Sequence, residues 1–548
     1  MPDSGPSPRP SRSAVDIRRF PWIRRLAADY AYDFDRLAPF FAGNPADRGA
    51  WTAAIARAQA CPHPRPEVAA LVSAQQRRRG APPQALAATL RLLEPRSVAI
   101  VTGQQAGLFG GPLFTLLKAL TAVKIAGQVS HEHGVPAVAV FWIEGEDHDW
   151  DEISSCSVLD ADLARRTVAI PPPPGAGSVP VAAILLDTSI TAALDQLGAV
   201  LPATEFTPAL LDQLRAAYHP GAGMADAFGR WLEMVLGRLG LVVYDASDPA
   251  AKPLVQPMFL RELEQPGHAS RLAAVAGQEL AARGYHAQVT PQEDSVALFH
   301  LDGLRQPIRR HGDGFAVGGS PRSREALIDE ARRHPAGFSP NVILRPVVQD
   351  TLFPTVSCVA GPNELAYLAQ LARVYAHFGV PMPLMSPRAS ATLLDSAAAR
   401  FLAHHDAPLE SLQDDEARLN HLLEQQLPAS VEQAFGDARR VVDERMHALM
   451  EHVPAIDPTL EGAARSALGR MQHDLESLHG KIIQAAKRRD ETLRRQFHRT
   501  RAQAFPDGHL QERMIGWVYF LNRYGPALVE RLIEELPLDL GRHWVITI

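Results

Sequence analysis

Short apolar runs separated by stretches of helical periodicity dominate the chain from about residue 97 to residue 388. Several of these runs are apolar on both of their alternating faces, as strands are when helices cover both sides of a sheet. The alternation of such strands with helices predicts an α/β core built on a parallel sheet. The expected strands are 97-SVAIV-101, 135-VPAVAVFW-142, 241-LVVY-244, 342-VILRPVV-348, 355-TVSCVAG-361 and 382-MPLM-385.

A different periodicity governs residues 396–504, which are almost entirely helical in pattern. Apolar residues recur there at alternating spacings of three and four, with charged residues on the other faces, which is a heptad seam. Proline punctuates the zone, so an antiparallel helical hairpin is the simplest arrangement. Such an arm can pair with a second copy or fold back on itself, and the sequence does not choose. The members of the seam are Leu468, Met471, Leu475, Leu478, Ile482 and Ala485.

These patterns divide the chain into successive parts. Residues 1–14, rich in Pro, Ser and Arg, predict a disordered leader. Residues 15–395 form the α/β core, with insertions over about residues 151–340, and residues 396–504 form the helical arm. Residues 505–548 contain a turn and a strongly apolar amphipathic helix, which we expect to return to the core.

The composition excludes several classes of function. The 548 residues exceed what one compact core holds, so two or three structural units are expected. The net charge of −6 argues against a partner such as nucleic acid or an anionic membrane surface. No apolar run approaches the about 20 residues that a membrane span needs, and no apolar signal core opens the chain.

The three cysteines, Cys61, Cys156 and Cys358, lie far apart and share no metal-ligand spacing. We expect all three to be free, buried thiols. So few cysteines, together with the missing signal core, predict a protein of the reducing cytoplasm.

The stretch 101-VTGQQAGLFGGPLF-114 joins the first expected strand to an amphipathic helix. The first turn of a helix leaves backbone N–H groups unsatisfied, and glycines let phosphate or carboxylate oxygens approach them. The spacing matches neither the G-x-G-x-x-G fingerprint nor a Walker A loop, so an anion-binding loop and a tight packing turn both stay open. The candidate ligands are Gly103, Gln104, Gln105, Gly107, Gly110 and Gly111, with Lys118 further along the helix.

The next expected strand ends in a dense acidic cluster, 141-FWIEGEDHDWDE-152. Because one crossover between consecutive parallel strands places their carboxyl ends at the same sheet edge, this cluster should face the glycine loop. That combination suits a nucleotide with Mg²⁺ or an amine-bearing substrate, although a solvated acidic loop fits the pattern equally. His148 can be a general base, a metal ligand or a partner that orients a ligand. The candidates are Glu146, Asp147, His148 and Asp149.

A third segment, residues 341–371, again has a strand that ends in glycine and opens a helix. Asn363 and Glu364 lie in the first turn of that helix, where capping and acidic residues also stand for purely structural reasons. Arg345, Gln349 and Asp350 interrupt an apolar stretch and need buried partners. Arg345 can hold a carboxylate or brace the fold through an ion pair, and Arg388 can face the same edge or lie at the surface.

These segments, taken together, resemble the bacillithiol-biosynthesis cysteine-adding enzyme family, a family of cysteine ligases. The resemblance rests on 102-TGQQAGLFGGPLFTLLKA-119, 139-AVFWIEGEDHDWDEI-153, 344-LRPVVQDTLFPTVSCVAGPNELAYLAQL-371 and 381-PMPLMSPRASATLLD-395, with smaller matches at 218-YHPG-221, 284-GYHAQV-289 and 505-FPDGHLQER-513. It implies a Rossmann-like nucleotide-binding core with insertions, followed by a C-terminal α-helical coiled coil through which family members dimerise.

The resemblance also implies a reaction, in which the amino group of glucosaminyl-malate is joined to the carboxyl group of cysteine. Such a ligation is uphill in water, so we expect ATP with Mg²⁺ to activate the carboxylate and no tightly bound cofactor. The missing Walker A loop favours an acyl-adenylate over an acyl-phosphate.

In this reaction the glycine loop, its two glutamines and Lys118 would contact phosphates. Asp147 and Asp149 would hold Mg²⁺ or the ammonium group of cysteine, and His148 would take a proton from the attacking amine. Arg345 or Arg388 would neutralise a carboxylate. Two other functions fit the same residues, namely a nucleotidyltransferase or amide ligase for another amino-sugar or thiol acceptor, and a non-catalytic coiled-coil scaffold.

Overall fold

The computed structural model describes residues 12–413, 415–424, 429–489 and 491–548. The described chain forms two compact units. The first contains the residues up to Thr392 together with His509–Ile546, and the second contains Leu393–Gly508 with Thr547–Ile548.

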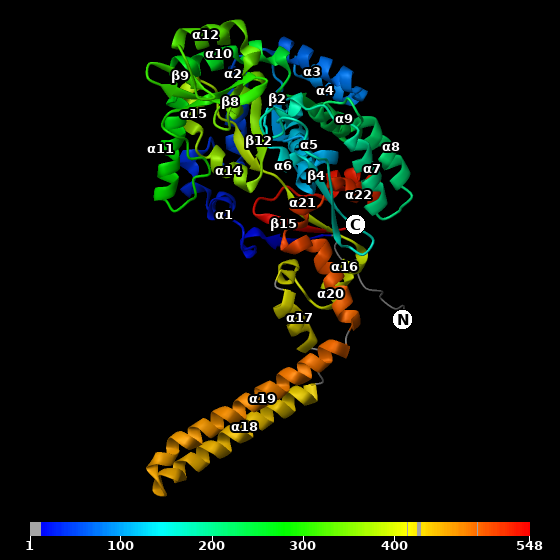
Figure 1. Ribbon diagram of the computed structural model, residues 1–548, viewed down its shortest axis with the longest axis vertical. Helices are drawn as coiled ribbons and strands as arrows, with labels where there is room; N and C mark the ends of the chain where they lie inside the picture. Colours follow the sequence, from blue (N-terminus) through cyan, green and yellow to red (C-terminus); the bar gives the residue numbers. More distant parts are fainter. Residues whose placement is uncertain (1–11, 414, 425–428, 490) are drawn as a thin grey trace. The chain divides into compact units, whose positions relative to one another are not determined.

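A five-stranded parallel sheet forms the centre of the first unit (Figure 1). All residues of its strands β3 and β12 are buried, because helices cover the sheet on both faces as the apolar runs predict. The strand order is β13 (Leu384–Pro387), β12 (Thr355–Ala360), β2 (Val98–Gln104), β3 (Ala137–Ile143) and β6 (Val242–Asp245).

The order of the strands creates a switch point between β2 and β12. The chain runs from β2 to β3 and β6 on one side of β2, and later adds β12 and β13 on the other side. Loops that leave the carboxyl ends of β2 and β12 therefore diverge and leave room for a ligand between them.

Helix α5 (Leu113–His133) makes the crossover from β2 to β3 and packs on both strands. Its length and composition would allow it to cross a membrane, contrary to the expectation from the apolar runs of the sequence. However, 67% of its most apolar stretch is buried inside the protein, so it is a core helix. Helix α22 (Trp517–Tyr524) and helix α23 (Ala527–Glu535) also contact it.

The run 342-VILRPVV-348 is not a strand, contrary to our expectation. Helix α13 (Arg345–Leu352) begins within it. The Asn341 side chain accepts hydrogen bonds from the backbone N–H groups of Ile343 and Leu344, and Pro346 stands in the first helical turn. A capped start with proline at this position favours a helix over the β-branched composition of the run.

The region between residues 151 and 340 contains a second, antiparallel sheet that the sequence patterns did not predict. Its order is β10 (Ser320–Arg322), β9 (Gly314–Val317), β8 (Leu304–His311), β7 (Ser295–Asp302) and β11 (Phe338–Pro340). Gly303, at φ +69°, makes the tight turn between β7 and β8. Helices α10 (Lys252–Glu264) and α11 (His268–Ala282) pack on β7, and α12 (Arg324–Arg333) packs on β9.

The remaining elements of the first unit are shorter. They are α1 (Arg25–Tyr32), α2 (Arg48–Ala60), α3 (Arg65–Arg79), α4 (Pro83–Arg91), α6 (Trp150–Ile153), β4 (Ser155–Leu159), β5 (Arg165–Ala169), α7 (Ser189–Val200), α8 (Thr207–Ala217), α9 (Met224–Leu236), α14 (Pro362–Leu368), α15 (Ala372–Phe378), β14 (Ser390–Leu394, whose last residues belong to the second unit) and α21 (Gln511–Met514).

Segments near the two ends of the chain pair with each other in the first unit. The disordered leader expected over residues 1–14 lies outside the described residues as far as residue 11, but residues 12–14 belong to strand β1 (Arg12–Asp16). This strand pairs antiparallel with β15 (Arg542–Thr547). Its backbone partners come from the far end of the chain, so no local pattern could reveal the strand.

The second unit is helical. Helix α16 (Ser396–His404) packs against α20 (Glu491–Ala504), and the other helices are α17 (Asp415–Glu424), α18 (Ala429–His452) and α19 (Glu461–Arg489). Helices α18 and α19 run side by side as the expected antiparallel hairpin (Figure 1). A hydrogen bond from Gln472 Nε2 to Asp443 Oδ1, at 2.6 Å, connects the two helices.

The heptad seam of α19 is only partly covered within the hairpin. Leu468 is buried, but Met471 and Leu478 are 44% and 50% exposed. Val441 and Leu449 of α18 are similarly exposed. The hairpin therefore leaves several of its apolar side chains partly exposed.

A buried carboxyl group in α10 makes the stability of the first unit depend on pH. Burial raises the pKa of Glu262 from 4.5 to about 7. Its Oε1 accepts the N–H groups of Gly267 and Ala297, whereas its Oε2 is buried without a partner among the described residues. Between pH 4.5 and 7 the unfolded chain releases a proton that the folded chain retains, so the free energy of unfolding falls as the pH rises.

Glu262→Gln keeps the Oε1 acceptor and cannot ionise. We expect it to raise the free energy of unfolding at pH 8, relative to the unaltered protein, by up to about 3 kcal/mol, and to have little effect near pH 4. Urea denaturation at both pH values measures this difference, with the exposed Glu279→Gln as control. A difference that does not change with pH would contradict the buried, protonated carboxyl.

Candidate active site

A cavity of about 660 Å³ lies at the switch point of the parallel sheet. The residues that follow β2, β3 and β12 line it, as the crossover argument predicts. They are joined by side chains from the antiparallel sheet, from α13 and from the C-terminal segment. The charged and amide residues of the lining are Gln104, Gln105, Lys118, Glu144, Asp147, Glu152, Arg305, Asn341, Arg345, Gln349, Asn363, Glu364, Arg388 and Arg513.

Lys118 ties the loop after β2 to the loop after β12. Its buried Nζ donates to the Gly103 carbonyl and to Gln104 Oε1, both at 2.9 Å, and forms an ion pair with Glu364 at 2.6 Å. Glu364 also accepts the N–H of Gly361 at the start of α14, which completes its capping role. Glu364 therefore caps α14 and also lines the cavity, whereas its expected contact with a substrate or nucleotide stays a prediction.

The glycine loop divides into a part that lines the cavity and a part that packs. Gly103 lines the cavity, but among the described residues Gly107, Gly110 and Gly111 do not. Gly110, at φ +97°, lies so close to Trp517 that a Cβ atom would be 2.2 Å from the indole nitrogen, which donates to the Gly110 carbonyl. Gly110 and Gly111 contact the C-terminal segment, and the Gly107 carbonyl accepts from Tyr218, so these three glycines have structural roles away from the cavity.

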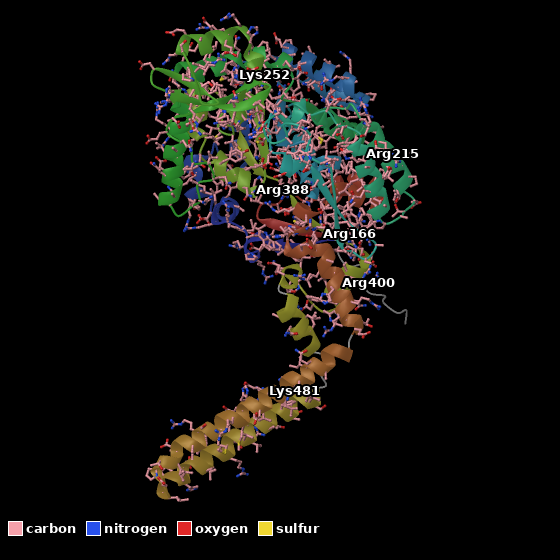
Figure 2. The ribbon with its side chains drawn as sticks, viewed as in Figure 1. Arg166, Arg215, Lys252, Arg388, Arg400 and Lys481 are labelled. Atoms are coloured by element: carbon pink, nitrogen blue, oxygen red, sulfur yellow. The ribbon has the colours of Figure 1, made fainter. Side chains whose placement is uncertain are left out.

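The acidic cluster does not converge on one point. Glu146 is buried and paired with Lys252, which is labelled in Figure 2, so the substrate contact expected of Glu146 is not available. Asp149 accepts the N–H of Glu152 as the cap of the short helix α6. Of the two remaining candidates, Asp147 lines the main cavity, and His148 lines a smaller acidic cavity beside it with Asp147 and Asp149.

Arg305, from the unexpected antiparallel sheet, fixes the orientation of Asp147 and His148. It is 8% exposed, stacks on Phe299, and donates from NH1 to Asp147 Oδ1 at 3.2 Å and to His148 Nδ1 at 3.1 Å. Because arginine only donates, Nδ1 accepts, and a neutral ring carries its proton on Nε2. In this arrangement His148 has no free basic nitrogen for the general-base role we expected.

The expected Mg²⁺ ligands do not form a binding site by themselves. Asp147 already accepts from Arg305 and Gln105, and Asp149 caps α6. Among the described residues no group of three or more His, Cys, Asp or Glu side chains is arranged to hold a metal ion. An Mg²⁺ ion carried by a nucleotide needs only one or two protein carboxylates, so the expected Mg²⁺ with ATP stays a prediction.

A chain of hydrogen bonds runs from the cavity into the core along α13. Arg345 forms an ion pair with Glu144 at 3.3 Å and donates to Gln349 Oε1 at 3.1 Å. Gln349 donates in turn to Asp350 Oδ1 at 2.9 Å, and Tyr375 donates to Asp350 Oδ2 at 2.6 Å. Arg345 and Gln349 line the cavity, whereas Asp350 is buried behind it, and burial raises the pKa of Asp350 to about 6.

Glu144 is the first acidic residue after β3 and a partly exposed carboxylate of the cavity wall. Burial raises its pKa to about 7, with the neighbouring Glu146 and Asp147 adding to the rise and Arg345 and Arg305 opposing it. A carboxyl group with a pKa near neutrality inside a cavity can exchange protons with a substrate at physiological pH.

Arg388, labelled in Figure 2, is buried and not at the surface. It forms a bidentate ion pair with Glu512, at 2.6 and 3.0 Å, and lies over the ring of Phe114. Burial alone would raise the pKa of Glu512, but Arg388 outweighs it and lowers that pKa. The neighbouring Arg513 lines the same cavity and has no carboxylate partner among the described residues.

The cysteines are free, as expected, but Cys61 is only partly buried. Cys358 of β12 lines the cavity, and burial raises the pKa of its thiol to about 12. It is a protonated wall residue at neutral pH.

Two family models match this chain and together cover almost all of it. Residues 14–389 match the family model described as "Bacillithiol biosynthesis BshC, N-terminal Rossmann-like domain", and residues 391–548 match "Bacillithiol biosynthesis BshC, C-terminal coiled-coil domain". The chain belongs to the BshC family. The resemblance drawn from the sequence motifs is thereby confirmed, as are the Rossmann-like fold and the coiled coil.

Relatives of similar length carry the same name, "Putative cysteine ligase BshC". The protein of Salinibacter ruber is 35% identical over 95% of this chain and 96% of its own, and that of Symbiobacterium thermophilum is 35% identical over 94% of each. The protein of Geobacillus kaustophilus is 31% identical over 97% of this chain and 100% of its own.

Five charged or amide residues of the cavity were not among the candidates chosen from the sequence, namely Glu144, Glu152, Arg305, Asn341 and Arg513. Glu144 lies in the acidic cluster, but the sequence offers no means of ranking its carboxylates. Arg513 closes the motif 505-FPDGHLQER-513, which was quoted for the resemblance alone. Arg305 was missed because the antiparallel sheet that carries it was not predicted.

The Arg388–Glu512 pair should matter far more for stability than an exposed pair. Glu512→Leu leaves a buried guanidinium without its carboxylate, so we expect a loss of about 3–5 kcal/mol in the free energy of unfolding. The matched control is Glu279→Leu, which removes the exposed partner of Arg373 and should cost about 0–1 kcal/mol. Equal losses for both variants in urea denaturation would refute the buried pair.

Proposed function

We propose that this protein joins the carboxyl group of cysteine to the amino group of glucosaminyl-malate, in the last step of bacillithiol biosynthesis. Membership of the BshC family and the name of its relatives support a cysteine ligase. The observation that carries the proposal is the cavity of about 660 Å³ at the switch point of the Rossmann-like parallel sheet. Carboxylates and cationic side chains both line this cavity.

An amide ligation needs groups of both signs. The amine-bearing substrate arrives as a cation and must lose one proton before it attacks and a second as the amide forms, for which Glu144, Asp147 and Glu152 offer carboxylates in the cavity lining. The carboxylate and phosphate groups need donors, for which Lys118, Arg345 and Arg513 are placed on the other segments. Arg513 is suited to an incoming anion, because it forms no ion pair with a described carboxylate, although Glu512 and Glu364 lie near enough to act on its charge.

ATP is the activating co-substrate in this proposal. A cavity of about 660 Å³ lies within the range of small-molecule sites, which is about 300–1,000 Å³. Transfer of AMP to the cysteine carboxylate would give an acyl-adenylate, and transfer of phosphate would give an acyl-phosphate. The absence of a Walker A loop supports the adenylate.

The proposal includes a homodimer in the cytoplasm. The exposed apolar residues Met471, Leu478, Val441 and Leu449 of the hairpin supply a surface that a second copy of the same hairpin would cover. The three cysteines form no disulfide, which is typical of proteins in a reducing compartment such as the cytoplasm.

The ligation is tested by incubating the protein with cysteine, glucosaminyl-malate, ATP and Mg²⁺ and identifying the products by mass spectrometry. We expect bacillithiol together with AMP, and bacillithiol with ADP would replace the adenylate by an acyl-phosphate. Arg513→Met should raise the KM for an anionic substrate about tenfold or more, because an ion-paired contact is lost. No amide from cysteine under any condition, with the protein folded, would contradict the ligase.

The dimer is tested by sedimentation. We expect the unaltered protein to sediment as a dimer and the double variant Met471→Glu with Leu478→Glu to sediment as a monomer, because four charges would be buried in the paired seam. Arg465→Ala, on the charged side of the same helix, is the control and should stay dimeric. A monomeric unaltered protein, or a dimer that survives the double substitution, would refute pairing through this seam.

A further inference from the structure

We propose that Glu144 is the general base of the ligation, and that Arg345, held by Gln349 and Asp350, is the residue that positions it. This inference rests on the proposed function and assigns a residue to its amide-forming step. It replaces His148, whose Nδ1 already accepts from Arg305.

The contacts of Glu144 leave one of its oxygens for a substrate. The Trp142 indole donates to Oε2 at 3.2 Å, and Arg345 Nε lies 3.3 Å from the same atom. Among the described residues no hydrogen bond to Oε1 is formed, and the side chain is 20% exposed in the cavity wall. Both contacts hold Oε2, which leaves Oε1 as the oxygen that a substrate amine can reach.

The other carboxylates of the cavity are less suited to take a proton. Asp147 accepts from Arg305, from Gln105 and from the backbone of His148. Glu364 accepts from Lys118 and Gly361. Hydrogen bonds to the charged form make a carboxylate a weaker base. Glu152 stands on the short helix α6, and burial raises its pKa as well, so it is the rival that the test must separate from Glu144.

The chain behind Arg345 has a fixed direction. Arg345 can only donate, so the Gln349 oxygen faces it and the Gln349 amide nitrogen must donate to Asp350. Tyr375 donates to the other oxygen of Asp350. Arg345 also donates to the hydroxyl of Tyr367 at 3.3 Å. The guanidinium is thus held from its far side, and its Nε is left to orient Glu144.

The charges around Glu144 tune it for this role. Arg345 on α13 and Arg305 on β8 favour its ionised form, whereas burial, Glu146 and Asp147 favour its protonated form. The balance leaves a base that is ionised at slightly alkaline pH and strong enough to accept a proton from an amine.

The step itself is a nucleophilic acyl transfer. The amine nitrogen of the acceptor attacks the activated carboxyl carbon of cysteine, and a C–N bond forms as the bond from that carbon to the phosphate oxygen breaks. The leaving phosphate group takes the bonding electrons. Glu144 Oε1 takes the proton that the nitrogen loses and later releases it to water.

The test separates carboxyl activation from amide formation. Hydroxylamine is uncharged at neutral pH and traps an activated cysteine carboxyl as a hydroxamate without a general base, whether the intermediate is an adenylate or a phosphate. We expect Glu144→Gln to keep hydroxamate formation and to lose amide formation about 10²–10⁴-fold. Glu262→Gln, the same change at a buried carboxyl outside the cavity, should leave both rates unaltered.

The pH profile tests the positioning residue. With saturating substrates, the rate of amide formation should rise with pH through the ionisation of Glu144. Arg345→Gln removes a positive charge that favours the ionised form of Glu144. The rising part of the pH profile should therefore shift to higher pH by about one unit. A residue with only a structural role would lower the rate without moving this part of the profile.

Two results would overturn the assignment of Glu144 alone. One is amide formation by Glu144→Gln within about threefold of the unaltered rate, and the other is loss of the amide step in Glu152→Gln in its place. If the unaltered protein forms neither hydroxamate nor amide from cysteine, the proposed function fails and the role of Glu144 falls with it.

Discussion

The parallel pairing of β2 with β3 on one side and β12 on the other determines what the cavity can contain. Pairing in register brings three chain segments that are far apart in sequence to one edge of the sheet: Gly103–Gln105, Glu144–Asp147 and Gly361–Glu364. Lys118 then binds the first of these segments to the third. The close approach of β2 and β3 also explains Gly103, where a Cβ atom would lie 2.9 Å from the Trp142 carbonyl.

Charge pairing is the second constraint. The buried cations of this region each face a carboxylate: Lys118 with Glu364, Lys252 with Glu146, Arg305 with Asp147, Arg345 with Glu144, and Arg388 with Glu512. An uncompensated charge at such depth would cost several kcal/mol, so the pairs keep the cavity polar at a tolerable energy. The same pairing separates structural carboxylates from carboxylates that remain available to a substrate. A carboxylate bound on all sides is structural, whereas one held from a single side keeps an oxygen for chemistry.

The sequence predicted the features that depend on local pattern. Alternating apolar runs identified β2, β3, β6 and β12, the heptad spacing identified the α18–α19 hairpin, and crossover geometry placed the glycine loop beside the acidic cluster. The sequence did not predict features that depend on contacts between residues far apart in the chain. The run 342-VILRPVV-348 contains the start of helix α13, after a turn in which the Asn341 side chain accepts backbone N–H groups. Gly110 packs against Trp517. The glycine turns 302-DG-303 and 318-GG-319 signalled hairpins, but the strands between them are too polar to show a clear alternation. Arg305 was missed with them.

The central claim is that activation of the carboxyl group and attack by the amine take place in the one cavity at the switch point. The most direct measurement is a crystal structure of the protein with a stable sulfamoyl analogue of cysteinyl-adenylate. The account predicts the cysteinyl group between Lys118 and Glu144, with its carbonyl carbon open to an amine on the Glu144 side. Binding of the analogue in any other cavity, with this one empty, would contradict it.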